Sequence, residues 1–219
     1  MKNLLSILLV FVLVSCSSTQ LVNNWKNPDI NTFEPTKILI VGMTSNKSAR
    51  KKFEKQFKEE YLSREIEAVT SLEMFGKSFS DDKKSETELK EVENRLTNEG
   101  FNSILFTKVI GVEDRIIFSE AYDDVENTRR RFRDDYFDNQ DIYYNRNYYE
   151  KYKVYHVETS LYCICSGKDR DLIWKGYIDI IDPSSVKETV DDYINLVLFV
   201  LEEQQLINKK VGEAGNTVL

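Results

Sequence analysis

The sequence has few of the residues that build metal and redox sites. Among its 219 residues are one histidine, His156, and three cysteines. His156 shares a predicted strand with Cys163 and Cys165 but has the opposite parity, so it faces away from both thiols. The two cysteines are two residues apart on one strand face, a spacing with parallel side chains that does not suit a disulfide. The sequence therefore predicts no metal site, and it predicts that these two cysteines pack as small apolar side chains.

Motifs for catalysis and for nucleotide binding are also missing. Neither G-x-S-x-G nor H-E-x-x-H occurs. Gly42 is followed after four residues by Lys47 and Ser48, but the second glycine that a phosphate-binding loop needs is absent. This segment predicts a helix N-terminus, and the binding of some anionic group there is the remaining alternative. We expect a non-enzymatic protein without a cofactor.

Only one long apolar run is present, and it is too short to span a membrane. It covers residues 4–14, which as a helix would extend roughly 16 Å against a hydrocarbon layer of about 30 Å. Lys2 precedes the run and the small residue Ser15 follows it, as in a targeting segment. The run is therefore predicted to direct export and is left out of the fold.

The end of this run resembles the lipobox of bacterial lipoproteins, in the residues Leu13-Val14-Ser15-Cys16. The resemblance implies cleavage before Cys16 and fatty acyl chains, such as palmitate, on that residue. Each buried methylene adds about 0.8 kcal/mol, so more than one chain gives stable membrane anchoring. Ser17 stands where an Asp retains family members at the inner membrane, which implies the outer membrane, facing the periplasm. The alternative is an ordinary secretory signal in which Cys16 has no role.

The net charge limits the classes of partner that the protein can attract, and the length limits the number of domains. The net charge of −7 disfavours long-range attraction to nucleic acid. The length fits one domain of ordinary size with a real core. We predict a signal peptide at 1–15, a tether at 16–36, a single globular domain at 37–208 and a loose tail at 209–219.

Apolar periodicity predicts two consecutive β-α-β units in this domain. Residues 37–42 read as a buried strand and residues 66–70 as a second strand. The helix between them has one apolar face, formed by Ala49, Phe53, Phe57 and Tyr61. A second helix begins with the capping box Ser85 and Glu88 and ends at Gly100. The run 101–110 then provides the third parallel strand.

The last part of the domain predicts a hairpin and a helix. Residues 153–165 and 172–181 read as two antiparallel strands joined by a tight turn. Ser185 and Glu188 then begin a final helix, whose apolar face should press against the sheet. The predicted fold class is α+β: a mixed sheet from β-α-β-α-β, followed by an antiparallel hairpin and a C-terminal helix packed on the sheet.

A region rich in tyrosine and arginine is predicted to contact a partner. It forms an insertion at 120–152, and eight of the twelve tyrosines lie between Tyr122 and Tyr155. Tyr and Arg dominate binding hot spots, while the surrounding carboxylates favour a protein or a glycan over nucleic acid. The candidate contact residues are Arg129, Arg131, Tyr143, Tyr144, Tyr148 and Tyr149. The alternative is a hairpin extension or flexible loop without a partner.

This order of elements behind a lipobox resembles a family of envelope lipoprotein domains. The family includes the periplasmic domain of the curli-secretion lipoprotein, the lipoprotein activators of penicillin-binding proteins and the amino-terminal domain of the Tol-Pal translocation protein. The likeness is carried by the lipobox, by strand 37–42 with the helix at 50–57, and by residues 174–183. It implies a lipid-anchored, non-enzymatic binding or scaffolding module for an envelope protein. The alternative is a small-molecule or glycan receptor that uses the strand ends near Thr44 and Lys47.

Overall fold

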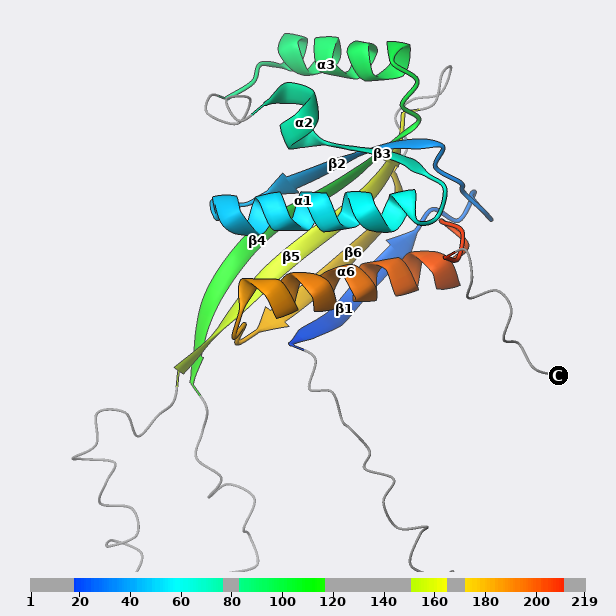
Figure 1. Ribbon diagram of the computed structural model, residues 1–219. Helices are drawn as coiled ribbons and strands as arrows, with labels where there is room; N and C mark the ends of the chain where they lie inside the picture. The colour runs from blue at the N-terminus through cyan, green and yellow to red at the C-terminus, as the bar shows by residue number, and fades with distance from the viewer. Residues whose placement is uncertain (1–17, 77–82, 117–150, 165–171, 211–219) are drawn as a thin grey trace, which may run out of the picture.

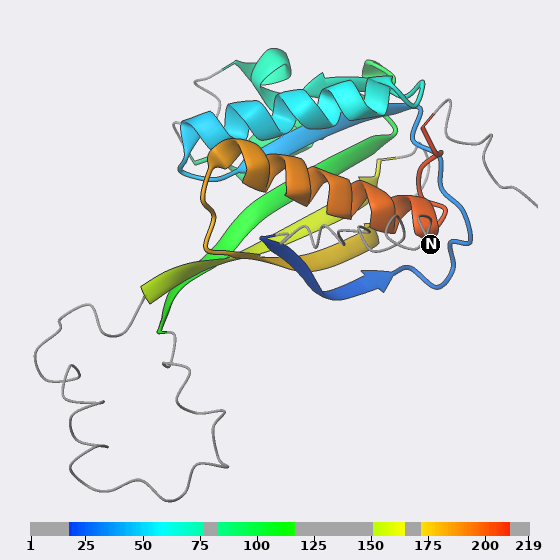
Figure 2. The ribbon, with the colours of Figure 1, turned by 60° about the horizontal axis from the view of Figure 1, so that its bottom comes forward.

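A six-stranded mixed sheet with helices on both faces forms the body of the protein (Figures 1 and 2). The computed structural model describes residues 18–76, 83–116, 151–164 and 172–210. The strands are β1 (Thr19–Lys26), β2 (Lys37–Met43), β3 (Glu67–Thr70), β4 (Ser103–Ile116), β5 (Lys151–Cys163) and β6 (Leu172–Ile181). The helices are α1 (Lys47–Leu62), α2 (Ser71–Phe75), α3 (Glu86–Asn98) and α6 (Val186–Glu203). The predicted α+β class is confirmed.

The sheet has the order β1-β6-β5-β4-β2-β3. Strands β3, β2 and β4 are parallel, as two consecutive β-α-β units require. Strand β5 runs antiparallel to both β4 and β6, which confirms the predicted hairpin. Because β5 is antiparallel to β4 and β6 is antiparallel to β5, β6 runs in the same direction as β4 and β2. Helices that follow β2 and β6 can therefore begin at the same end of the sheet.

Helices α1 and α6 lie side by side on one face of the sheet and enclose the main core (Figure 2). The predicted apolar faces of both helices point into this core. Its largest fully buried side chains include Trp174 of β6 and Phe57 and Tyr61 of α1. The rings of Phe53 and Phe57 meet edge to face with centroids 4.9 Å apart.

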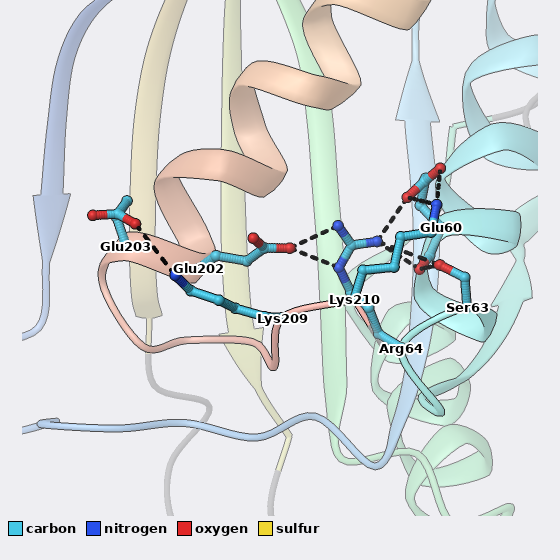
Figure 3. A network of polar contacts seen from close by, with 7 residues as sticks. All are labelled: Glu60, Ser63, Arg64, Glu202, Glu203, Lys209 and Lys210. Atoms are coloured by element: carbon cyan, nitrogen blue, oxygen red, sulfur yellow. Dashed lines mark hydrogen bonds and ion pairs between the residues drawn. The ribbon is translucent and has the colours of Figure 1, made fainter. Parts of the chain in front are cut away.

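The carboxyl ends of α1 and α6 are tied together by Arg64 (Figure 3). The Arg64 side chain is only 7% exposed, and its guanidinium lies 2.7 Å from Glu60 Oε2 and 2.6 Å from Glu202 Oε1. Burial opposes the charged form of Glu60, but the hydrogen bond from Arg64 and the nearby charge of Lys210 lower the pKa of Glu60 below its ordinary value. This network fixes the two helices against each other at the end opposite their N-termini.

The opposite face of the sheet is covered over β2, β3 and β4 by α2 and α3 (Figure 1). Leu39 points to this side because side chains alternate along β2, and it packs with Leu96 of α3. The capping box of Ser85 and Glu88 is present at the start of α3, as predicted. Gly100 follows the helix with φ +84°, the left-handed conformation expected of a terminating glycine.

Two elements were not expected from the sequence. The segment predicted as a tether contains the edge strand β1, which pairs antiparallel with β6 from Thr19 opposite Ile180 to Lys26 opposite Trp174. The segment directly after β3, for which no helix was predicted, contains the short helix α2, which begins with a capping box of Thr70 and Glu73. Both elements are polar or short, so neither shows a clear apolar period.

The prediction for Cys163 is wrong, because this residue is disulfide-bonded. The prediction assumed that Cys163 and Cys165 continue one regular strand. Strand β5 ends at Cys163, so the fixed spacing of alternate strand residues does not apply beyond it. Cys163 is nevertheless buried in the main core, on the same strand face as Leu161, as its parity predicts. The other two cysteines, Cys16 and Cys165, lie outside the described residues.

Several further predictions concern residues that the structure does not describe. The lipobox with Cys16 is one of them. The insertion with Arg129, Arg131, Tyr143, Tyr144, Tyr148 and Tyr149 is another. In the described part of the chain, no helix is long and apolar enough to cross a membrane.

Candidate functional site

The N-termini of α1 and α6 border a cleft on the face of the sheet that these two helices cover. We call it the helix-end cleft. Its volume is about 340 Å³. Both helices begin at this end because each follows the carboxyl end of a strand that runs in the same direction. Figure 1 shows the two helices starting side by side, next to the long β4 and β5 strands.

A polar side chain caps the N-terminus of each of these two helices. Asn46 Oδ1 accepts a hydrogen bond from Ala49 N at 3.0 Å, and Ser185 Oγ accepts one from Glu188 N at 3.1 Å. One of the orphan N–H groups is thereby satisfied at each helix. The remaining N–H groups of both first turns give this end of the molecule a positive electrostatic character.

The floor of the helix-end cleft is apolar. It is formed by Phe53 and Val190 from the two helices and by Val109, Val157 and Ile180 from the sheet. Phe53 also leans on the Tyr193 ring, with centroids 6.1 Å apart. This floor can receive the hydrocarbon part of a ligand.

A chain of three hydroxyl groups runs beneath the cleft. Thr159 Oγ1 lies 2.6 Å from Thr107 Oγ1 and 2.7 Å from Tyr193 Oη. Thr107 and Tyr193 line the cleft, whereas Thr159 is fully buried below them. Burial raises the pKa of Tyr193, so its phenol keeps its proton at physiological pH and remains a donor.

Thr189 of α6 adds a fourth hydroxyl to the same cleft. Its side chain lines the cleft and is 8% exposed. Among the described residues it has no side-chain hydrogen-bond partner, although its backbone N–H is bonded to Ser185 O. Its hydroxyl oxygen is not one of the fully buried unpartnered atoms of the described residues, so it stays accessible from the cleft.

A buried carboxylate holds the α1 side of the cleft in place. Glu54 is fully buried, and its Oε1 accepts hydrogen bonds from Gly42 N at 3.1 Å and Arg50 Nε at 3.0 Å. Ser71 Oγ at 2.6 Å and Leu72 N at 3.1 Å also donate to this carboxylate. These contacts join the end of β2, helix α1 and helix α2, and they pair the charge of Arg50.

Gly42 allows this arrangement because of its missing side chain. A Cβ at this position would lie 3.1 Å from Phe53 Cδ1 and 3.5 Å from Arg50 Cγ. The first turns of α1 could then not approach the end of β2 as closely. The glycine that the sequence analysis placed at the end of a strand therefore also lines the helix-end cleft.

The two residues predicted from the sequence for a ligand site, Thr44 and Lys47, both lie at the helix-end cleft or beside it. Thr44 lies on the rim of the cleft, where its hydroxyl accepts a hydrogen bond from Asn46 N at 3.2 Å. Lys47 is the first residue of α1 and is exposed to solvent beside the cleft. The predicted helix N-terminus is confirmed, and its N-cap is Asn46.

Thr107, Thr189 and Tyr193 were not singled out from the sequence. Thr107 falls within a β-rich run, and Tyr193 falls on the apolar face of α6, so each resembles an ordinary core residue. The only available signal was hydroxyl groups at positions predicted to be buried, because a buried hydroxyl needs a partner.

The single histidine lies away from this cleft. His156 Nδ1 is 2.7 Å from Asp179 Oδ1, and its Nε2 is 3.4 Å from Glu113 Oε1. The parity of β5 places His156 on the opposite face from Val157 and Cys163, as predicted. No group of three or more potential metal ligands occurs among the residues that the structure describes.

Comparisons with known proteins give only remote similarities. No protein-family model matches the chain, and no curated protein matches it. A PelC dodecamer structure from Paraburkholderia phytofirmans has 10% identity and a TM-score of 0.40, covering 86% of this chain and 98% of that one. Lipoprotein GNA1162 from Neisseria meningitidis has 11% identity and a TM-score of 0.41, covering 77% of this chain and 99% of that one. No functional conclusion follows from likenesses at this level.

Proposed function

We propose that this protein is a lipid-anchored, non-enzymatic binding protein of the bacterial envelope, and that it holds a small organic ligand in the helix-end cleft. The observation that carries the binding part is the cleft itself. Its volume of about 340 Å³ falls in the usual range of small-molecule sites, which are concave and mostly apolar with a few placed polar groups.

The lining of the cleft favours binding over catalysis. Among its described lining residues are hydroxyl, amide and apolar side chains, but no histidine, cysteine or carboxylate. Arg50 is the charged residue there, and its guanidinium is already bonded to Glu54 and Ser71. Such groups can hold and orient a ligand, but they offer no general base near neutral pH.

A neutral fluorescent probe tests the binding site. N-phenyl-1-naphthylamine carries no charge and brightens in apolar surroundings, so it reports on the apolar floor alone. Ala49 is half-buried and lines the cleft. We expect Ala49→Trp to fill the cleft and to weaken probe binding by at least about tenfold, roughly the effect of 1.4 kcal/mol.

Lys55→Trp is the matched control for this experiment. Lys55 lies on the same helix with a side chain that is 71% exposed, away from the cleft. This variant adds the same indole without blocking the site, so probe binding should equal that of the wild type. The proposal is contradicted if Ala49→Trp binds the probe as tightly as Lys55→Trp.

The lipid anchor has its own test. The proposal that Cys16 carries the acyl chains rests on its resemblance to a lipobox cysteine. Cells fed radioactive palmitate should label the wild-type protein, whereas a Cys16→Ala precursor should take up no label. Ser18→Ala serves as the control, because it alters the same segment without removing the acylated residue. An unlabelled wild-type protein would contradict the anchor.

The binding of an envelope protein through the Tyr/Arg insertion stays a separate prediction. Replacing Tyr143, Tyr144, Tyr148 and Tyr149 by serine should abolish crosslinking to a stoichiometric partner in envelope extracts. The same replacements should leave probe binding in the helix-end cleft unchanged. A partner retained by the serine variant would show that the insertion is not the contact surface.

A further inference from the structure

We propose that the ligand of the helix-end cleft is an amphipathic oxyanion, a carboxylate or phosphate headgroup joined to a hydrocarbon part. This inference rests on the proposed function and specifies its ligand class. The headgroup lies at the paired N-termini of α1 and α6, and the hydrocarbon part lies on the apolar floor. Three features of the described residues support this assignment: the paired helix ends, the hydroxyl chain and Thr189.

The helix ends provide a positive environment for the headgroup. Two helices of sixteen and eighteen residues begin beside the cleft, and each presents backbone N–H groups without carbonyl partners. The first turn of α1 has no acidic residue to offset this charge and carries Lys47. A basic residue at a helix N-terminus is unfavourable without an anion nearby, and a bound oxyanion would relieve the conflict.

The hydroxyl chain adds two polar groups to the cleft. Thr107 and Tyr193 both line the cleft, and each of their hydroxyls is hydrogen-bonded to that of the fully buried Thr159. These contacts hold both hydroxyls in place, where either can bond to an oxygen of the ligand.

Thr189 supplies a hydroxyl donor, independently of the helix ends. It lines the cleft, is more than nine-tenths buried, and its hydroxyl has no partner among the described residues. A ligand oxygen would satisfy this group, whereas an entirely apolar ligand would leave it unsatisfied. A hydroxyl can also accept a hydrogen bond, so Thr189 alone does not indicate whether the ligand is negative or positive. The positive N-termini of the two helices indicate a negative headgroup.

The charged side chains around the cleft are compatible with an anion. The carboxylate of Glu54, which contacts the cleft residues Gly42 and Arg50, accepts four hydrogen bonds and is paired with Arg50. Glu188 in the first turn of α6 is exposed and accepts a hydrogen bond from Ser184 Oγ at 3.2 Å. A cationic headgroup would face the positive ends of two helices and is therefore disfavoured.

A series of eight-carbon ligands tests the headgroup. Isothermal calorimetry with octanoate, octyl phosphate, octanol and octylammonium compares four headgroups on one hydrocarbon chain. We expect both oxyanions to bind at least about tenfold more tightly than octanol and octylammonium. Equal affinities across the series, or a preference for octylammonium, would overturn the inference. The order of octanoate and octyl phosphate distinguishes a carboxylate ligand from a phosphate ligand.

Inorganic phosphate tests whether the hydrocarbon part matters. It carries the headgroup chemistry of octyl phosphate without the chain, so it should bind at least about tenfold more weakly, because each buried methylene contributes favourably. If inorganic phosphate binds as tightly as octyl phosphate, the ligand is a free anion and the amphipathic assignment is wrong.

Thr189→Val tests the buried donor with little change in volume. Loss of a hydrogen bond to a charged group should weaken octanoate binding by about tenfold or more. Thr97→Val is the matched control, because Thr97 is a helical threonine on α3 whose hydroxyl donates to Glu93 O at 3.0 Å. Octanoate affinity unaffected by Thr189→Val would contradict the assignment of this donor.

The two proposals fail in different ways. If Ala49→Trp leaves the binding of the neutral probe unchanged, the cleft is not the binding site and the proposed function fails. If Ala49→Trp excludes the probe but the four eight-carbon ligands bind with equal affinity, the cleft binds ligands and only the oxyanion assignment fails.

Discussion

Removing the carboxylate of Glu54 should destabilise the fold more than any change at an exposed glutamate of the same helix. Glu54 is fully buried and accepts four hydrogen bonds that connect β2, α1 and α2. In Glu54→Ala the guanidinium of Arg50, whose side chain is 12% exposed, loses its carboxylate. The backbone N–H groups of Gly42 and Leu72 lose their acceptors at the same time.

The size of this effect follows from the loss of one partner of a buried ion pair. Breaking a buried ion pair by removing one partner costs about 3–5 kcal/mol. For a domain of this length, 1 kcal/mol lowers the melting temperature by about 2–4 °C, so Glu54→Ala should lower it by roughly 6–20 °C. The loss is a large fraction of the 5–15 kcal/mol that typically stabilises a domain.

Urea unfolding followed by circular dichroism measures the change, with two further variants for comparison. Glu59→Ala breaks a pair with Lys55 whose side chains are 60% and 71% exposed, and it should cost no more than about 0.5 kcal/mol. Glu54→Gln keeps the side-chain volume but turns an amide N–H₂ toward donors, so it should also destabilise. The reasoning is refuted if Glu54→Ala costs no more than Glu59→Ala, or if Glu54→Gln is as stable as the wild type.

Three other outcomes are expected. Gly176→Ala should lower the free energy of unfolding by about 1–3 kcal/mol, because a Cβ there would lie 2.3 Å from Cη2 of the buried Trp174 ring; an unchanged urea midpoint would contradict this. The lowered pKa of Glu60 gives stability that is present above pH 4.5 and lost as the pH falls below that value. Arg64→Ala should therefore flatten the acid dependence of the melting temperature, and an unaltered dependence would exclude this linkage. Cys163 should resist alkylation until the protein is reduced, since it is disulfide-bonded; labelling without reductant, read by mass spectrometry, would disprove the bond.

Local patterns in the sequence predicted much of the sheet and its covering helices. The apolar face of Phe53, Phe57 and Tyr61 indicated α1, and the capping box of Ser85 and Glu88 placed the start of α3. These signals can be read from the sequence because helix periods and caps depend on residues within a few positions of each other.

Strand β1 and the disulfide of Cys163 could not be predicted in this way. Five of the eight residues of β1 are exposed, because this edge strand has only one neighbour, and its conformation depends on pairing with β6 residues 148 to 161 positions later. The free-thiol prediction for Cys163 failed because it depended on where β5 ends, which is set by pairing with β4 and β6.

Apart from β1 and α2, the sequence by itself determined the order of the elements from β2 to α6, the parallel and antiparallel parts of the sheet formed by β2 to β6, and the helix N-terminus near Thr44 and Lys47. Only the tertiary structure decided that α6 begins beside that helix end, and that Thr107, Thr189 and Tyr193 share one cleft with it. The physical reason is that strand direction and pairing bring distant residues together, whereas each hydroxyl, viewed in its own segment, looks like an ordinary residue of a strand or a helix.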